Sequence, residues 1–263
     1  MIERHEHRLE IAGPVATITL DRPAAYNAVT GRLLRSLAQT LGEVAGDPAV
    51  RAVVMTGAGK AFCAGQALDD AELFRDGVPA DIHAAVAAGF NPVVHALLTM
   101  EKPVVAAVNG VAAGAGFGIA LACDFRIVAH PATFTTAFAK IGLVPDSGVS
   151  LLLPRMIGYA RAMELCMLAG KIDAAAAQAL GLVTELVPFE QVVARAQAFA
   201  AQLAAGPKAL GLIKRELVRN GLDDIGAALA CEAEVQSIAA QTSDAHEGIR
   251  AFGAKRPPRF TGH

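Results

Sequence analysis

Residues 102–118 read KPVVAAVNGVAAGAGFG, and this stretch decides the fold of the chain. It opens with the short β-branched run of a buried strand. The chain then breaks at Asn109-Gly110, passes through small residues and continues from Ile119 as an apolar helical pattern. A strand, a Gly-rich turn and a helix start present bare backbone N–H groups at the positive end of a helix dipole. The stretch therefore predicts a site for a phosphate, or for a carbonyl oxygen that becomes negative during a reaction.

Length and composition predict one large domain, or one domain with an appendage. The chain has 263 residues, of which 54% are hydrophobic, and a formal net charge of −2. This balance argues against a basic nucleic-acid-binding surface. The four cysteines form no C-x-x-C pair, so we expect reduced thiols, not a disulfide framework or a zinc site.

The lack of a recognisable targeting signal predicts a cytoplasmic protein. The charged start of the chain lacks the apolar core of a secretory signal. The longest apolar run, Val111–Cys123, is too short to cross a bilayer and contains glycines. We therefore expect no membrane partner.

Strand and helix patterns alternate along the first two thirds of the chain, which predicts an α/β domain with largely parallel pairing. Thr30 is expected to cap a helix that continues through Leu41, and helical sequence resumes in the 80s and 90s. The pattern is helical again from about Phe189, and the composition changes near residues 189–206. Strands are predicted at 15–20, 50–56, 102–108, 125–129 and 182–187.

Several common motifs fail on spacing. The glycines at 114, 116 and 118 do not form G-x-G-x-x-G, and no acidic residue ends a strand about twenty positions on. Residues 57–60 lack the spacer of a P-loop. The seven histidines have no metal-ligand spacing, and Ser147 lacks the first glycine of a nucleophile elbow. Nucleotide, metal and serine-hydrolase chemistries are therefore not supported.

Two similar units remain, at residues 56–68 and 109–119. Each is a strand followed by a loop of small residues. If the two strands are adjacent and parallel, their carboxyl ends bring two backbone N–H groups near one point, which is the geometry of an oxyanion hole. The alternative is two tight turns that pack closely without chemistry, and spacing alone leaves both open.

Three segments resemble the crotonase (enoyl-CoA hydratase/isomerase) superfamily: Phe62–Gly65, Asn109–Gly116 and Ala122–Arg126. The match runs in register from Asp21-Arg22-Pro23 to Ala251–Arg256. The resemblance implies an α/β spiral of ββα units, with a catalytic and acyl-CoA-binding core at 1–195. It also implies a C-terminal helical trimerisation region at 196–263, and hence a homotrimer or a hexamer made of two trimers.

The resemblance implies an acyl-CoA thioester substrate, with no metal and no cofactor apart from the coenzyme A of the substrate. The thioester oxygen would be held by the backbone amides of Ala64 and Ala115. Phe252 and Lys255 match a pair that reaches a neighbouring subunit's CoA, although Lys255 read alone is a solvated tail charge. The residues implied to contact CoA or the acyl group are Ala24, Ala25, Tyr26, Gln66, Ala67, Leu68, Gly114, Phe138, Phe252 and Lys255. Ala67 departs from the family pattern A-G-x-D-L.

Hydratases of this superfamily use two glutamates around a water. In register these fall at Gly118 and Phe138, and neither residue can transfer a proton. The remaining candidate is Asp146, at the position of the catalytic aspartate in dienoyl-CoA isomerases and in phenylacetate-pathway 1,2-epoxyphenylacetyl-CoA isomerases. The segment Pro145–Gly148 looks closest to the latter group. Read without the family, Asp146 is a helix N-cap.

We therefore expect an acyl-CoA isomerase in which Asp146 takes a proton from one carbon and returns it to another. The reaction would shift a double bond or convert 1,2-epoxyphenylacetyl-CoA to oxepin-CoA. Burial beside Phe138, Leu143 and Val144 is expected to raise the pKa of Asp146. Two alternatives stay open: a catalytically silent acyl-CoA-binding subunit, and an enoyl-CoA hydratase with its acid at Asp69, Asp70 or Glu72. Residues 73–88 are expected to cover the acyl pocket.

Overall fold

A six-stranded sheet forms the centre of the computed structural model, which describes residues 6–70, 74–75, 78–79, 81–222 and 224–261. The β1–β2 pair is antiparallel, and the other pairs in this sheet are parallel. The strand order is β1 (His7–Ala12), β2 (Val15–Leu20), β3 (Ala52–Gly57), β7 (Val104–Val108), β9 (Phe125–Ala129) and β12 (Glu185–Val187).

A second, four-stranded sheet is built from short strands. Its order is β11 (Lys171–Asp173), β10 (Thr133–Thr135), β8 (Val111–Ala113) and β4 (Ala61–Cys63), with β4, β8 and β10 parallel. The pairs β3–β4, β7–β8 and β9–β10 each place one strand in the large sheet and the next in the small sheet. Helices follow each pair, so the predicted spiral of ββα units is confirmed. A separate hairpin pairs β5 (Phe74–Arg75) with β6 (Val78–Pro79).

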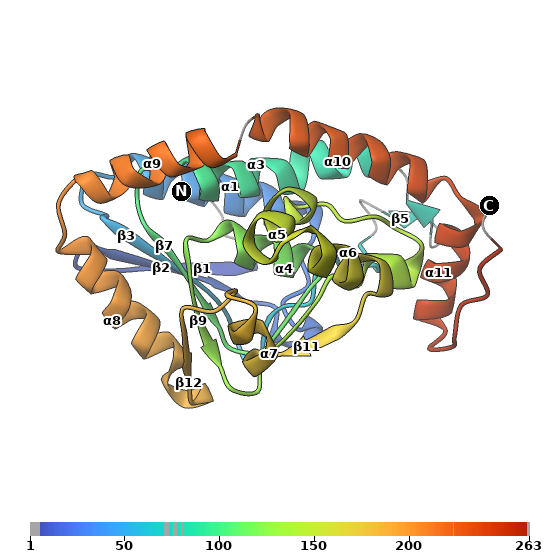
Figure 1. Ribbon diagram of the computed structural model, residues 1–263, viewed down its shortest axis with the longest axis horizontal. Helices are drawn as coiled ribbons and strands as arrows, with labels where there is room; N and C mark the ends of the chain where they lie inside the picture. The colour runs from blue at the N-terminus through green and yellow to red at the C-terminus, as the bar shows by residue number, and fades with distance from the viewer. Residues whose placement is uncertain (1–5, 71–73, 76–77, 80, 223, 262–263) are drawn as a thin grey trace.

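Helices cover both faces of the large sheet (Figure 1). One face packs on α1 (Gly31–Gly46), α3 (Asn91–Thr99), α4 (Ala115–Ala122) and α5 (Val149–Ile157), which share one apolar core with it. The remaining short helical elements are η1 (Pro23–Ala25), α2 (Ile82–Ala85), the π-helix η2 (Val86–Phe90), η3 (Phe138–Ile141), α6 (Tyr159–Leu168), α7 (Ala174–Ala179) and η4 (Phe189–Gln191).

The C-terminal part of the chain is helical, as predicted. It contains α8 (Val192–Ala204), α9 (Ala209–Gly221), α10 (Ile225–Ala240) and α11 (Ser243–Gly253). α8 packs Ala196, Ala200 and Ala204 on the opposite face of the large sheet. The expected boundary between residues 195 and 196 therefore falls inside α8. α9 and α10 run one after the other along the upper edge of the molecule (Figure 1).

Local sequence signals account for several element bounds. Thr30 caps α1 as predicted, because its hydroxyl oxygen accepts from the Leu33 N–H at 3.0 Å. Strands β2 and β9 have the predicted limits, 15–20 and 125–129. β12 begins at Glu185, three residues later than predicted, because the Leu182 carbonyl accepts from the Arg126 side chain.

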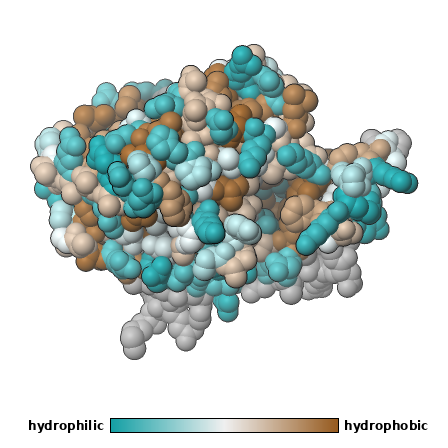
Figure 2. Space-filling view, turned by 90° about the horizontal axis from the view of Figure 1, so that it is seen from below, coloured by the Kyte–Doolittle hydropathy of each residue, from teal (hydrophilic) through white to brown (hydrophobic). Residues whose placement is uncertain are grey.

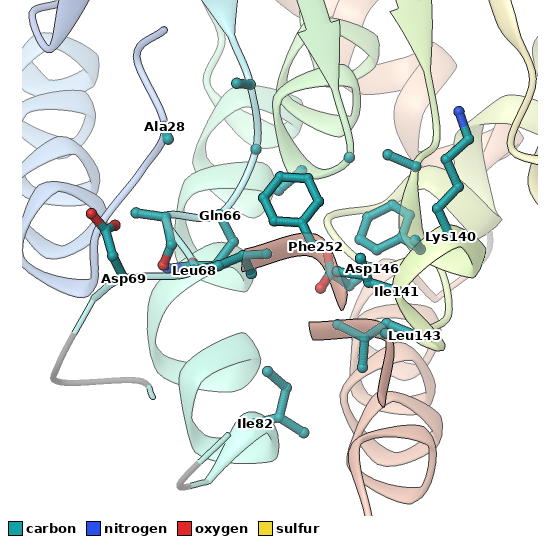
Figure 3. A pocket seen from close by; sticks show the side chains of 18 of the residues that line it. Ala28, Gln66, Leu68, Asp69, Ile82, Lys140, Ile141, Leu143, Asp146 and Phe252 are labelled. Carbon is teal, nitrogen blue, oxygen red and sulfur yellow. The ribbon is translucent and has the colours of Figure 1, made fainter. Parts of the chain in front are cut away.

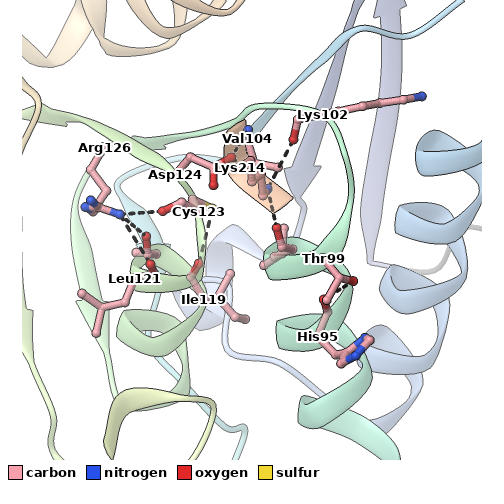
Figure 4. Close-up of polar contacts among 12 residues, drawn as sticks. His95, Thr99, Lys102, Val104, Ile119, Leu121, Cys123, Asp124, Arg126 and Lys214 are labelled. Atoms are coloured by element: carbon pink, nitrogen blue, oxygen red, sulfur yellow. Dashed lines mark hydrogen bonds and ion pairs between the residues drawn. The ribbon is translucent and has the colours of Figure 1, made fainter. Parts of the chain in front are cut away.

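The motif Ala122–Arg126 has a structural role (Figure 4). Asp124 accepts from the Val104 N–H at 2.7 Å and forms an ion pair with Lys214 of α9 at 2.8 Å. The buried guanidinium of Arg126 donates to carbonyls near the end of α4, including that of Cys123 at 2.6 Å. These contacts tie α4, β7, β9 and α9 together.

One helical stretch among the described residues, Ile82–Thr99, is long and apolar enough to cross a membrane by length and composition. Its elements α2, η2 and α3 pack against α1, α4 and α10, which identifies it as part of the protein's own core. The cysteines are free thiols, as expected. Polar and apolar side chains are interspersed on the face seen in Figure 2.

Candidate active site

A largely apolar cavity of about 740 Å³ lies where the two sheets, α2, η2, η3, α10 and α11 meet. Figure 3 shows Gln66 and Leu68 on one side of it, Ile141 and Leu143 on the other, and Phe252 between them. Further lining residues are Ala25, Tyr26, Ala28, Ala64, Gly65, Ala67, Asp69, Ile82, Ala85, Phe90, Gly114, Ala115, Ala137, Phe138, Lys140, Asp146, Gln236, Gly248, Arg256, Pro258 and Phe260.

Asp146 is the buried carboxylate of this cavity and is only 4% exposed. Its oxygens accept from the Ser147 hydroxyl at 2.8 Å and from the Gln236 side-chain amide at 2.9 Å. Burial raises the pKa of Asp146 to about 6, and the two hydrogen bonds oppose that rise. A carboxylate with this pKa is ionised and moderately basic near neutral pH, as a general base needs to be.

Asp146 does not cap α5. Its side-chain bonds go to Ser147 and Gln236, whereas the carboxylate of Glu232 accepts from the N–H groups of Gly148 and Ser150 at 2.8 and 3.0 Å. The cap interpretation is therefore wrong, because a distant glutamate satisfies the N-terminus of this helix.

The structure also contradicts Ala64 as an oxyanion donor. The Ala64 N–H donates to the Tyr26 carbonyl at 3.0 Å and is not available to a substrate. Two residues on, Gln66 forms a parallel bridge with Val29, in which Val29 bonds to the Gly65 carbonyl and the Ala67 N–H. In this pairing the Gln66 N–H points away from Val29, and no acceptor for it is present among the described residues.

A second free amide at the cavity belongs to Ala115, the other residue that the resemblance implies as a donor. It is the first residue of α4, so its N–H has no partner within the helix, and no other acceptor lies within the described part of the chain. The α4 dipole adds partial positive charge at this point. Both Gln66 and Ala115 line the cavity.

Glycines bring the two loops together. A Cβ at Gly65 would lie 2.8 Å from the Ala113 carbonyl oxygen, and one at Gly116 would lie 2.2 Å from that of Cys63. Only a residue without a side chain allows this backbone-to-backbone approach. The close packing of the two loops therefore places two free amides at one cavity, which is what an oxyanion hole requires.

The position that a hydratase glutamate would occupy is closed. A Cβ at Gly118 would lie 2.5 Å from the Ser147 carbonyl oxygen. The turn that carries Asp146 therefore fills the space of a larger side chain at 118. The second position, Phe138, presents a buried aromatic ring to the cavity.

Comparison with known proteins agrees with this geometry. The profile of the enoyl-CoA hydratase/isomerase family matches residues 10–263. The chain belongs to this family, within the crotonase superfamily.

Individual members of the family are similar over nearly the whole chain. The 1,2-epoxyphenylacetyl-CoA isomerase of Escherichia coli K12 is 41% identical over 94% of this chain and 95% of its own length. A probable enoyl-CoA hydratase of Rhodobacter capsulatus is also 41% identical, over 98% of both chains. The crystal structure of an enoyl-CoA hydratase from Mycobacterium avium subsp. paratuberculosis has a TM-score of 0.88 at 33% identity and covers 97% of this chain and 98% of that chain.

Most of the residues assigned to CoA or acyl contacts by family resemblance lie together. Ala25, Tyr26, Gln66, Ala67, Leu68, Gly114, Phe138 and Phe252 line the cavity. Ala24 is exposed in η1 next to it, and Lys255 is exposed on the turn after α11, so neither lines it. Phe252 lines the cavity of its own chain, because α11 packs on η3 with Gly248 against Ile141.

The family resemblance did not identify the contribution of α10. Gln236 and Glu232 were missed, although they lie four positions apart on a helix face whose other buried residues are apolar. Ile82 and Ala85 line the cavity within the range expected to cover it, and Phe90 lines it just beyond that range. Residues 73, 76, 77 and 80 of the range lie outside the described residues.

The alternative acids differ in placement. Asp70 accepts from the Gly31 N–H at 2.8 Å and supports the start of α1. Asp69 is exposed and lines the cavity, and Glu72 lies outside the described residues. Within the described chain there is no cluster of three or more side chains suited to hold a metal ion.

Proposed function

We propose that this family member is an acyl-CoA isomerase in which Asp146 moves a proton between two carbons of the acyl group. The observation that carries the proposal is a single buried carboxylate, Asp146, in an apolar cavity that also holds the free amides of Gln66 and Ala115. One group that accepts and returns the same proton suffices for isomerisation, whereas hydration needs a second acid near a water.

The proposed reaction has two proton transfers. Asp146 removes a proton from a carbon activated by the thioester, and the electron pair of the C–H bond moves onto the thioester oxygen as an enolate. The N–H groups of Gln66 and Ala115 stabilise that oxygen, and loss of one such donor typically costs about 3 kcal/mol of barrier. Protonated Asp146 then returns the proton to another carbon as the enolate collapses.

The proposed substrate is either an unsaturated acyl-CoA whose double bond is shifted, or an acyl-CoA that carries an aryl epoxide. Similarity to the 1,2-epoxyphenylacetyl-CoA isomerase supports the conversion of such an epoxide to an oxepin, and so a place in phenylacetate catabolism. A cytoplasmic location, trimeric or hexameric assembly, and no cofactor beyond the coenzyme A of the substrate complete the proposal.

Hydration remains the second candidate, because a relative of equal identity is named a probable enoyl-CoA hydratase. In that case the exposed cavity residue Asp69 would supply the acid.

Deuterium exchange tests the proposal directly. 3-Enoyl-CoA and phenylacetyl-CoA are incubated in D2O with the wild type, Asp146→Asn or the matched control Asp69→Asn, and label is located by mass spectrometry. We expect label at the α- or γ-carbon with the wild type and Asp69→Asn, and at least a thousandfold slower labelling with Asp146→Asn. Added water that persists in Asp146→Asn would identify a hydratase. Tight binding with neither label nor isomerised product would identify a silent binding subunit. Both outcomes would overturn the proposal.

A further inference from the structure

We propose that Gln236, on α10, is a positioning residue that orients the Asp146 carboxylate and holds it ionised, while Glu232 fixes the turn that carries it. The inference rests on the proposed role of Asp146 as proton carrier. It gives part of the C-terminal helical region, expected from resemblance to serve oligomerisation, a function in the chemistry.

Gln236 has one possible orientation. Its Oε1 accepts from the Val144 N–H at 3.0 Å, and its Nε2 donates to Asp146 at 2.9 Å. A backbone N–H can only donate, so the amide cannot flip without losing this bond. The donor end of Gln236 therefore always faces the carboxylate. At 1% exposure, no water replaces it.

Glu232 holds the same turn from one helical turn away. Its carboxylate accepts from the Gly148 N–H at 2.8 Å, the Ser150 N–H at 3.0 Å and the Ser150 hydroxyl at 2.6 Å. Residues four apart lie on one face of a helix, so α10 presents both side chains to the segment 144–150.

This turn needs external support. Ser147 and Gly148 have φ values of +56° and +77°, and a left-handed Ser is a costly conformation. The contacts of Glu232 and Gln236 bracket these two residues. The direction in which the Asp146 carboxylate points thus depends on α10.

The groups that stabilise the ionised form of Asp146 are mainly neutral hydrogen-bond donors. Glu232 of α10 is the ionisable group packed closest behind the turn, and burial raises its pKa to about 7. The other charged residues of the cavity are Asp69, Lys140 and Arg256, and the Lys140 amine points away from Asp146 (Figure 3). Because no cation contacts Asp146 among the described residues, the hydrogen bonds from Ser147 and Gln236 are what favour its ionised form.

α10 is itself firmly placed. Leu229, Ala233 and Ala240 belong to the main apolar core, and the Leu229 carbonyl accepts from the Asn91 side chain at 3.1 Å. A rigid support is what a positioning residue requires, since small misplacements of a catalytic group cost large factors in rate.

The test compares Gln236→Met with Gln241→Met, which makes the same change at an exposed position at the end of α10. Methionine keeps the length of the side chain and removes both hydrogen bonds. Without the donor, the ionised form of Asp146 is disfavoured, so the pKa seen in the kcat–pH profile should rise by about one unit. We expect kcat at pH 6 to fall on the order of tenfold or more, with KM within about threefold of the wild type. Gln241→Met should match the wild type.

Gln236→Glu is the second variant and preserves size and the acceptor for Val144. It places a second carboxyl against Asp146, and two carboxyls at such a distance do not both ionise readily. The pair then titrates in two steps, and its upper apparent pKa should exceed that of Gln236→Met, which in turn should exceed the wild-type value. A residue that served packing alone would give no such order.

An infrared difference titration, with Asp146→Asn as the subtracted reference, follows the Asp146 carboxyl itself and needs no turnover. The same order of midpoints is expected there. Wild-type midpoints and an unchanged kcat–pH profile in both Gln236 variants would overturn the inference. If Asp146→Asn retained full exchange activity, the proposed function would fail, yet the infrared order would still show whether Gln236 controls Asp146.

Discussion

Two carboxylates contact the C-terminal helices, and they differ in burial and in partner: Asp146 is buried, whereas the Asp124 side chain is 22% exposed. Asp124 contacts the ammonium of Lys214 on α9 at 2.8 Å, whereas Asp146 contacts the neutral amide of Gln236 on α10 at 2.9 Å. Burial raises the pKa of both groups, but at Asp124 the charge of Lys214 opposes the rise. At Asp146 only neutral donors do so.

The difference separates a structural charge from the carboxylate that we propose to carry a proton. A neighbouring cation lowers the pKa of a carboxyl and so favours its ionised form, which suits a fixed contact. One that is buried with neutral donors has a pKa nearer to neutral, which suits a group that must take up and release a proton. The Asp124 site joins elements of the fold, and the Asp146 site opens to the cavity.

Removing the cation gives the largest expected effect. Lys214→Met leaves the partly buried Asp124 without its counter-charge and removes the buried Lys214 ammonium from its carbonyl acceptors, and breaking such a pair costs about 3 kcal/mol in the free energy of unfolding. The loss should shrink at acid pH, where Asp124 takes up a proton. Urea unfolding at pH 8 and pH 5 measures both effects.

The double variant Lys214→Met/Asp124→Asn is the control for this effect. Asparagine keeps an acceptor for the Val104 N–H but carries no charge. We expect the double variant to be more stable than Lys214→Met alone. Strictly additive losses would show that the two charges do not stabilise each other.

At Asp146 the expected effect on stability has the opposite sign. The folded-state pKa, about 6, lies above the unfolded value of 3.8, so burial of the ionised form destabilises the fold as pH rises through 6. Asp146→Asn removes that penalty, and its amide can accept from Gln236 and donate to Ser147. At pH 8 it should stabilise the protein on the order of 2 kcal/mol, because one pKa unit corresponds to about 1.4 kcal/mol.

The gain should vanish below pH 4, where the wild-type carboxyl is protonated as well. Melting temperatures of wild type, Asp146→Asn and the exposed control Asp69→Asn across this range measure it. Equal stability of the wild type and Asp146→Asn at pH 8 would show that burial of the ionised Asp146 carboxylate does not destabilise the fold.

The sequence predicted the parts of the fold that have long local signals. The β-branched runs of β2 and β9 and the Thr30 cap of α1 lie where expected. The three-residue strands β4, β8 and β10 were not predicted, because so short a run has no detectable period. Their pairing joins segments 22 residues apart for β8 and β10 and 50 residues apart for β4 and β8, and local patterns do not record such contacts.

The site was predicted less evenly. Family resemblance led to Asp146 and Ala115, and backbone pairing then showed that Ala64 is occupied and that Gln66 carries the free amide. Which way an N–H points depends on strand register, and side-chain identity says nothing about it. Gln236 lies ninety residues after Asp146, so its contact with that carboxylate exists only once α10 has docked.

The smallest effect comes from a charge pair of the same length at the surface. Arg161 and Glu164 of α6 approach to 2.7 Å, with side chains 64% and 52% exposed. Exposed pairs at this helical spacing contribute about 0.5 kcal/mol or less, so Glu164→Gln should barely change the urea midpoint. The contrast with Lys214→Met would show that burial, and not contact length, sets the strength of these pairs.

α6 also exposes Tyr159, Met167 and Leu168. A loss above about 1 kcal/mol that grows with protein concentration would contradict the surface assignment and place this pair in an interface between copies of the chain.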